Sequence, residues 1–367
     1  MASVEQEDIR SLKPAQWHEL LAPYRRSSMA RSLYQLGNTL VPYLALWGLM
    51  YLSLVVGYWL TLLLAIPTGF FLVRLFVLQH DCGHGSFFKS NKINDTVGFF
   101  LGVLTLMPYA YWRKTHAIHH ATSGDLDRRG FGDIATLTVR EYLSLSPQRR
   151  LAYRFYRNPL VLLLIGPLYQ FVIKHRFPAD IPWSWKREWQ SVHLTNLVLA
   201  GVVLFMWQTI GLKAFLAVQL PITMFSGAVG VFLFYMQHQY EDTYWRFHES
   251  WNYYEAGLKG SSHYRLPRIF QWLTANIGIH HIHHVCSRIP NYNLQRCMNE
   301  NALLQDVTTL TFWQSIKTLF NSLWDEDTHR LIGFRQVKQV KNRLLESGER
   351  VGELDERRAR AVPPAYR

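Results

Sequence analysis

The stretch SLYQLGNTLVPYLALWGLMYLSLVVGYWLTLLLAIPTGFFLV, residues 32–73, contains no Lys, Arg, Asp or Glu. As one helix its 42 residues would extend about 63 Å, whereas roughly 20 residues cross the hydrocarbon core of a bilayer. The stretch is therefore long enough for two crossings. It predicts two membrane spans, about 35–56 and 58–78, joined by a tight turn near Gly57.

A second charge-poor unit covers residues 189–240 and is interrupted only by Lys213. It predicts two further spans, about 191–211 and 214–237, again joined as a hairpin. Each hairpin returns to the side from which it starts, so residues 74–188 and 241–367 lie on the side of the N-terminal segment. Most Lys and Arg residues fall on this side, and the positive-inside rule predicts that it is cytoplasmic.

The composition supports a membrane-embedded chain. Hydrophobic residues make up 49% of the sequence and charged residues only 18%, where about a quarter is usual for a soluble domain. The net charge of +13 would also suit a nucleic-acid partner. The cations Arg25, Arg26 and Arg31 instead flank an apolar segment, as anionic lipid headgroups favour. We therefore expect a multi-pass integral membrane protein, in a bacterial inner membrane, that binds no nucleic acid.

Two shorter apolar runs, residues 97–107 and 158–173, are too short to be ordinary spans. The second contains Pro159 and Pro167, and both runs predict interfacial or half-inserted helices. A full crossing by residues 158–173 would place the histidine clusters described next on opposite sides of the membrane, where they could not share a site.

The chain after residue 300 is expected to be soluble. Val337, Val340 and Leu344 at helical spacing predict one amphipathic helix, and residues 353–367 predict a charged, mobile tail. The predicted organisation is a cytoplasmic N-terminal segment (1–31), a membrane domain (32–300) and a cytoplasmic C-terminal helix and tail (301–367).

Three short clusters hold more than half of the sixteen histidines: HDCGH at 80–84, HAIHH at 116–120 and HHIHH at 280–284. Spacings of three and four residues place side chains on one face of a helix. His281 falls outside this spacing and is expected to point away from the others. One more histidine follows the fourth predicted span. The candidate ligands are therefore His80, His84, His116, His119, His120, His238, His280, His283 and His284.

Nine imidazoles exceed the needs of one metal ion and suit two ions that keep an open position for dioxygen. Shells rich in nitrogen and poor in thiolate favour iron, zinc or copper over magnesium or calcium. A structural zinc site is the main alternative, but such sites are closed and four-coordinate. The isolated histidines are expected to be ordinary hydrogen-bonded residues. Possible acceptors for the ligands' N–H groups are Asp81, Asp125, Asp127, Glu241, Asp242 and Asn276.

HxxxH, HxxHH and HxxHH, in this order and separated by a predicted hairpin, resemble the histidine boxes of the membrane fatty-acid desaturase family. The resemblance covers roughly residues 35–300. It implies an all-α integral membrane fold, with four transmembrane helices in two hairpins, interfacial helices and a cytoplasmic helical cap carrying a di-metal site. It also implies two non-haem iron ions bound by the eight box histidines, with His238 matching the family's additional ligand, and dioxygen as co-substrate.

The same resemblance implies the reaction, which is the insertion of a cis double bond into a lipid-linked acyl chain. HDCGH followed by Gly-Ser-Phe, and HHIHH followed by Ile-Pro-Asn-Tyr, look like the acyl-lipid omega-6 (delta-12) and omega-3 group. The chain lacks the fused haem domain of the front-end desaturases, so a separate ferredoxin-like donor and its reductase should supply electrons. Residues 108–112 and 232–235, both rich in aromatic side chains, are possible walls of an acyl tunnel.

Two other classes of function remain open from the sequence. Related enzymes, namely an acyl hydroxylase, an acetylenase or a carotenoid ketolase, use similar histidine boxes and differ in their product. A non-catalytic membrane receptor or metal-storage protein would have no oxidase activity. Product analysis separates the first class, and dioxygen consumption coupled to a reductant separates the second.

Overall fold

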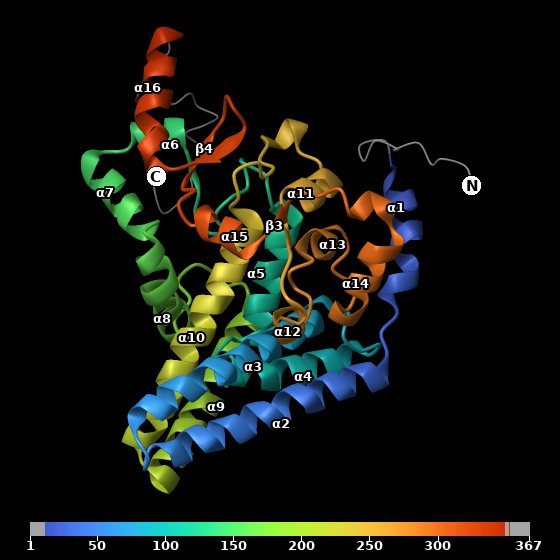
Figure 1. The fold of residues 1–367 in the computed structure, drawn as a ribbon, viewed down its shortest axis with the longest axis vertical. Helices are drawn as coiled ribbons and strands as arrows, with labels where there is room; N and C mark the ends of the chain where they lie inside the picture. Colours follow the sequence, from blue (N-terminus) through green and yellow to red (C-terminus); the bar gives the residue numbers. More distant parts are fainter. Residues whose placement is uncertain (1–11, 349–351, 353–367) are drawn as a thin grey trace.

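The computed structural model describes residues 12–348 and residue 352, and helices form most of this part of the chain (Figure 1). The predicted tail at 353–367 and the first eleven residues of the predicted N-terminal segment lie outside the described residues. Four long helices lie in the regions of the four predicted spans: α2 (Met29–Ser53), α3 (Tyr58–His84), α9 (Lys186–Ile210) and α10 (Leu212–His238).

Within the described residues, α3, α9 and α10 are long and apolar enough to cross a membrane. Helix α2 is 25 residues long but is not one of these three helices, and two of its polar side chains contact other parts of the protein. The Gln35 amide donates to Asn291 Oδ1 at 2.9 Å, and Thr39 Oγ1 accepts from Arg74 Nε at 2.9 Å. These contacts show that the polar residues of α2 face the protein. A fourth crossing by α2 stays a prediction.

Helix α3 lies at the centre of the molecule and packs against α2, α4 (Asn91–Leu104) and α10. Its predicted end was residue 78, but the helix continues to His84 and ends at Gly85, whose φ is 64°. Leu75 and Leu78 of α3 pack with Val218 and Ile222 of α10 in the main apolar core. The first histidine cluster is therefore part of the central helix itself.

Residues 161–174 form one continuous apolar helical segment, assembled from η2 (Val161–Ile165), α8 (Gly166–Leu168) and η3 (Tyr169–Lys174), with π-type turns at both ends. At 14 residues it is too short for a span, which agrees with the predicted short helix. The other predicted short helix appears as α4. Neither helix interrupts the hairpin arrangement.

The remaining helices and short helical turns cover one end of the long helices (Figure 1). They are α1 (Pro14–Leu21), η1 (Ala22–Arg25), α5 (Tyr109–Thr122), α6 (Val139–Ser144), α7 (Pro147–Tyr156), η4 (His248–Ser250), α11 (Tyr253–Lys259), α12 (Arg268–Leu273), α13 (His280–Val285), α14 (Asn291–Glu300), η5 (Ala302–Leu304), α15 (Phe312–Thr318), η6 (Phe334–Gln336) and α16 (Val337–Glu346). Val337, Val340 and Leu344 are buried along α16, which confirms the predicted amphipathic helix.

The expectation of an all-α fold was incomplete, because five short strands tie distant loops together. Strand β1 (Leu137–Thr138) pairs in parallel with β4 (Leu323–Asp325), which pairs in antiparallel fashion with β5 (Arg330–Ile332). Strand β2 (His263–Tyr264) pairs in parallel with β3 (Thr309–Leu310). Strands of two or three residues give little period-two pattern, so the sequence carried no usable signal for them.

Candidate metal centre

Four helices bring the nine predicted histidines together at one end of the hairpins. Helix α3 carries the first cluster on its last turns, α5 carries the second, and the short helix α13 carries the third. His238 is the last residue of α10. These segments lie up to about 200 residues apart in sequence, and the structure unites them in one place, as the spacing argument predicted.

The ligand atoms form two neighbouring groups. His80, His84, His116, His120 and His283 each offer a nitrogen, and these five atoms all lie within 4.8 Å of one another. His119, His238 and His284 form a second group under the same limit.

The two groups are in direct contact, and the ninth histidine adjoins the second. The rings of His120 and His284 stack with centroids 4.1 Å apart and so join the groups. His280 lies outside both sets, but its Nε2 is 3.0 Å from Nε2 of His238. The arrangement therefore offers two adjacent centres.

A glycine in the first cluster explains how α5 approaches α3. A Cβ atom added at Gly83 would lie 2.7 Å from Cζ3 of Trp112, which is closer than real side chains come. Trp112 in turn stacks on His116, with ring centroids 4.6 Å apart. Gly83 therefore lets the indole lie against the α3 backbone and holds the second cluster beside the first.

The buried imidazoles outside the spans are held in the neutral form. Burial, reinforced by neighbouring imidazoles, lowers the pKa of His116, His120, His280, His283 and His284 well below 6.5. A neutral imidazole keeps one nitrogen lone pair, which is the form that binds a metal ion. These five imidazoles therefore offer lone pairs to a cation and carry no positive charge of their own.

Several buried ring nitrogens have no hydrogen-bond partner in the part of the chain that the structure describes, although buried polar atoms are normally satisfied. These atoms are Nδ1 of His80, Nε2 of His84, Nε2 of His119, Nδ1 of His120, Nδ1 of His280 and Nε2 of His284. Elsewhere Nε2 atoms face each other, as in His283 and His120 at 3.1 Å. Unpaired nitrogens that converge in this way fit metal ions, and an all-nitrogen set suits iron, zinc or copper.

Two histidines are oriented by contacts on the ring side away from the centre. His238 Nδ1 lies 3.3 Å from the Gly260 carbonyl oxygen, which leaves Nε2 directed at its neighbours. His119 Nδ1 contacts Oδ1 of Asp133, so its Nε2 is free for the second group. Carboxylates and carbonyls in this position fix the tautomer of a metal-binding histidine.

Asp133 was not among the acceptors predicted from sequence. It lies in a loop between α5 and β1, fourteen residues after the histidine that it contacts. The only sequence signal was the neighbouring Gly132, whose φ is +73° and whose added Cβ would lie 3.2 Å from Cβ of His119. A glycine that permits close packing on a histidine cluster could have indicated this loop.

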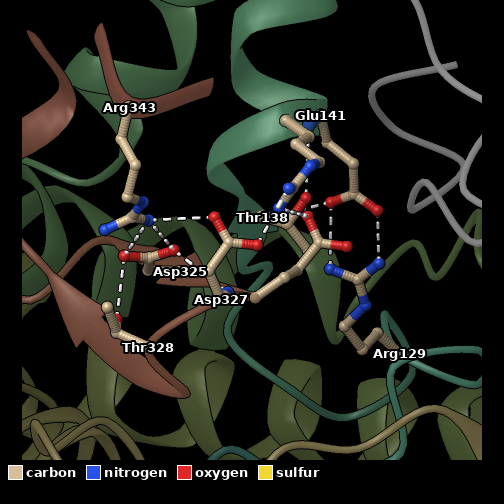
Figure 2. A network of polar contacts seen from close by, with 9 residues as sticks. Arg129, Thr138, Glu141, Asp325, Asp327, Thr328 and Arg343 are labelled. Carbon is tan, nitrogen blue, oxygen red and sulfur yellow. Dashed lines mark hydrogen bonds and ion pairs between the residues drawn. The ribbon is translucent and has the colours of Figure 1, made fainter. Parts of the chain in front are cut away.

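The loop that carries Asp133 is fastened by a network of ion pairs (Figure 2). Arg129 donates to the carbonyl oxygens of Leu126 and Thr136 at 2.7 Å each, and to both carboxylate oxygens of Glu141 at 2.5 and 3.0 Å. Its bonds to residues on either side of Asp133 hold both ends of the loop. The network thus supports the position of a residue that contacts the centre.

The predicted acceptors mostly serve other purposes. Asp81 lies nearest, with Oδ1 3.6 Å from His80 Nδ1, but its other oxygen accepts from the backbone N–H of Asn291 at 2.7 Å. Asp125 and Asp127 contact His248, Glu241 and Asp242 pair with Arg330 at the surface, and the Asn276 amide donates to the Asn291 carbonyl oxygen.

His281 lies apart from the candidate ligands, as predicted. Its Nε2 lies 2.9 Å from the Leu304 carbonyl oxygen, outside both nitrogen groups.

The aromatic residues proposed as tunnel walls contribute two rings to the centre. Trp112 stacks on His116, and Phe234 lies 5.1 Å from His119 and 5.0 Å from His238, between ring centroids. These rings shield one side of the centre from water.

Comparisons with known proteins agree with this site. The fatty acid desaturase family matches residues 57–313. A fatty acid desaturase of Bacillus subtilis (strain 168) is 44% identical over 328 residues, covering 89% of this chain and 93% of that protein. An sn-1 acyl-lipid omega-3 desaturase (ferredoxin) of Nostoc sp. (strain 36) is 27% identical, covering 68% and 69% of the two chains.

An sn-1 oleoyl-lipid 12-desaturase of Anabaena variabilis is 28% identical, covering 68% of this chain and 71% of that protein. The family match spans more than half of the chain and contains all nine candidate ligands. The histidine arrangement and the comparisons therefore lead to one conclusion. The chain belongs to the fatty acid desaturase family, whose members are oxidoreductases.

Proposed function

We propose that the protein is an acyl-lipid desaturase that uses dioxygen to insert a cis double bond, of the delta-12 (omega-6) type, into a lipid-linked acyl chain. The observation that carries the proposal is the convergence, beside apolar helices, of nine imidazoles, six of which have a ring nitrogen without a hydrogen-bond partner among the described residues. Relatives named as oleoyl-lipid 12-desaturases and as an acyl-lipid omega-3 desaturase support the substrate class.

The nine histidines would hold two iron ions. The five-nitrogen group of His80, His84, His116, His120 and His283 suits one ion, and the group of His119, His238 and His284, joined by His280, suits the other. With dioxygen, the irons would supply the oxidising power that breaks an unactivated C–H bond, which no acid or base in the chain could do.

The protein's own residues position and protect this chemistry. Asp133 and the Gly260 carbonyl orient His119 and His238, so that their Nε2 atoms face inward. Trp112 and Phe234 pack against the imidazoles and exclude water. The overall reaction removes two hydrogens from a –CH2–CH2– pair and consumes one dioxygen, two electrons and two protons to release two water molecules. A ferredoxin-like donor and its reductase would supply the electrons.

The centre would lie on the cytoplasmic side of a membrane crossed four times. All nine histidines lie at the same end of the two hairpins, where α3 and α10 end. Exposed positions for cysteine labelling are Gln148 and Gln339 on the cap and Val55 in the α2–α3 turn. In a variant with the native cysteines replaced by serine, Gln148→Cys and Gln339→Cys should react only from the cytoplasm and Val55→Cys only from outside. Opposite accessibility of Gln148→Cys and Gln339→Cys would contradict the shared site.

The activity is tested by expression in a host that lacks polyunsaturated fatty acids. Fatty-acid profiling with double-bond localisation should show a new cis double bond at the delta-12 position of acyl chains recovered from lipids. A double bond at another position would retain the desaturase and reject the delta-12 assignment. Hydroxylated or acetylenic products would instead assign the chain to one of the related enzymes, and an unchanged profile would reject the proposal.

A further inference from the structure

A basic pocket of about 500 Å³ opens beside the metal centre. Its wall is formed by the segment before α2, the segment after α3 and the segment after α13. Four cationic side chains converge on it: Arg25, Arg26, Lys89 and Arg288. Arg26, Lys89 and Arg288 are exposed and Arg25 is half-buried. Gly85 of the wall directly follows His84, so the pocket adjoins the first histidine cluster.

The four cations have no acidic partner within residues 12–348, and no Asp or Glu in that range lines the pocket. Arg25 contacts His18 Nε2 at 2.6 Å, and Arg288 donates to the Gly85 carbonyl oxygen at 3.5 Å. The nearby Arg296 differs, because it pairs with Glu300 at 2.9 Å. Four like charges gathered in one concavity repel each other and attract an anion.

The pocket lies where a lipid headgroup would lie. Ser27 precedes the first turn of α2 and Gly85 ends α3, so the pocket marks the level at which the first hairpin leaves the apolar region. Next to it on α2, the side chains of Met29, Leu33 and Tyr34 are exposed by 49%, 55% and 73%. A charged concavity continuous with an exposed apolar helix face matches the two parts of a phospholipid.

We infer that this pocket binds the phosphate of an anionic phospholipid and thereby selects the lipid whose acyl chain is desaturated. The inference deepens the proposed function and rests on it for the role of the bound lipid. A volume of about 500 Å³ suits a small polar headgroup, since pockets for small ligands measure about 300–1,000 Å³. Its concave shape is less suited to the surface of an acidic electron-donor protein.

The test measures lipid binding to the purified full-length protein in a neutral detergent. The probe is dioctanoyl phosphatidylglycerol, and dioctanoylglycerol serves as the matching lipid without phosphate. The charge-reversed variant is Arg26→Glu/Lys89→Glu, because both side chains are exposed and away from the candidate ligands. Lys338→Glu/Lys341→Glu on α16 is the control, since it reverses two exposed cations elsewhere. Circular dichroism and the unfolding midpoint show whether each variant is folded.

The Kd for dioctanoyl phosphatidylglycerol should rise about tenfold or more in Arg26→Glu/Lys89→Glu and remain unchanged in the control, because each cation near an anionic lipid contributes to binding. Should Arg26→Glu/Lys89→Glu be unstable, Arg26→Gln/Lys89→Gln should show a smaller rise in the same direction. Equal Kd values in wild type and in a folded pocket variant would overturn the inference. So would equal binding of the phosphate-free lipid.

Two further arms identify other anions. If inorganic phosphate displaces the lipid at equal concentration, the pocket is a soluble-phosphate site and the lipid inference is wrong. If the pocket variant leaves lipid binding unchanged but slows reduction by a ferredoxin, the pocket is a donor-docking site and the inference is also wrong.

Failure of this inference and failure of the proposed function give different results. Binding is measured without turnover, whereas the activity is read from fatty-acid profiles. If the desaturated product forms but the pocket variant binds the lipid as well as wild type does, only the headgroup site is rejected. Pocket-dependent lipid binding without product in any lipid rejects the desaturase activity and leaves an anionic-lipid site.

Discussion

Two buried clusters of ionisable side chains lie close together in this protein, and they are satisfied in opposite ways. In the network of Figure 2, Arg129 pairs with Glu141, and Arg343 lies 2.8 Å from Asp325 and 3.0 Å from Asp327. In the histidine centre, six ring nitrogens have no hydrogen-bond partner among the residues that the structure describes. Among the same residues, Asp133 is the one carboxylate within hydrogen-bonding distance of a centre histidine.

The difference separates a structural cluster from one that requires a ligand. Buried charges are tolerated when opposite charges or hydrogen bonds within the chain compensate for lost hydration. The ion-pair network meets this condition with its own residues. The histidine centre does not meet this condition, because its unpaired ring nitrogens find no hydrogen bonds within the described chain. A ligand from outside the chain has to supply the missing interactions, and metal ions are what unpaired imidazole nitrogens bind.

The largest effect is expected from removing a candidate ligand at the centre. His283→Ala should abolish the desaturated product and lower iron content, while membrane insertion is unchanged, because the five-nitrogen group loses one member. His84→Ala and His119→Ala should behave alike. Fatty-acid profiles and metal analysis check this, with His329→Ala, an exposed position outside both groups, as control. Near-normal turnover in His283→Ala would remove the third box from the site.

The next effect is expected in the ion-pair network and concerns folding. The Arg129 and Glu141 side chains are 1% and 2% exposed, so Arg129→Met leaves a buried carboxylate without its cation. The free energy of unfolding should fall by about 3–5 kcal/mol. Arg129→Met/Glu141→Gln should recover part of this loss, since no charge is then buried. If the double variant is no more stable than Arg129→Met, Arg129 stabilises the fold mainly through its bonds to the carbonyl oxygens of Leu126 and Thr136.

Asp133 contacts the histidine centre from the loop that Arg129 holds, and its replacement should weaken metal binding. Asp133→Asn keeps the shape of the side chain but removes the charge beside His119. The affinity for iron should fall about 10- to 100-fold, as is usual when such a partner is lost. Metal titration of the apo-protein measures this, and the optical spectrum of the loaded centre should also shift. Asp242→Asn, at the surface ion pair with Arg330, should leave both unchanged.

His238 tests the size of the ligand set. If it is the ninth ligand, His238→Ala should lower iron content and activity together by about tenfold or more, which corresponds to about 1.4 kcal/mol. If its role is only the contact with the Gly260 carbonyl, His238→Gln should be nearly silent, because an amide can donate the same bond. Full activity and full iron occupancy in His238→Ala would reduce the set to eight.

The smallest effect is expected at the solvent-exposed edge of the network. The Arg343 side chain is 42% exposed and water can take its place, but the Asp325 side chain is only 3% exposed, so Arg343→Ala should lower the free energy of unfolding by about 1 kcal/mol. Burial raises the pKa of Asp325, but hydrogen bonds from Arg343 and Thr328 outweigh it, and the net pKa lies below 3.8. The contribution is therefore complete above pH 3.8 and is lost as the pH falls below it. The difference between Arg343→Ala and wild type should vanish in that acidic range.

The two clusters also differ in how far the sequence predicts them. Long stretches without charged residues predicted the hairpins, and three- and four-residue spacings predicted which histidines share one face of a helix. Both signals are local, and the long helices then bring the clusters together. Asp133 depends on a loop path that the bonds of Arg129 to Leu126 and Thr136 fix, and the adjacent Gly132 is the one local sign of that path. Likewise β1 and β4 pair across more than 180 residues, through strands too short to leave a pattern.

Helix α3 is unbroken from Tyr58 to His84, so its length fixes the distance between its two ends. The apolar turn near Gly57 lies at one end of α3, and two histidines lie on the final turns at the other end. Inserting a single residue before His80 would rotate both imidazoles by about 100° and displace them by about 1.5 Å. Such a change would turn them away from their partners. The distance of the centre from the apolar turn near Gly57 is therefore set by the residue count of one helix.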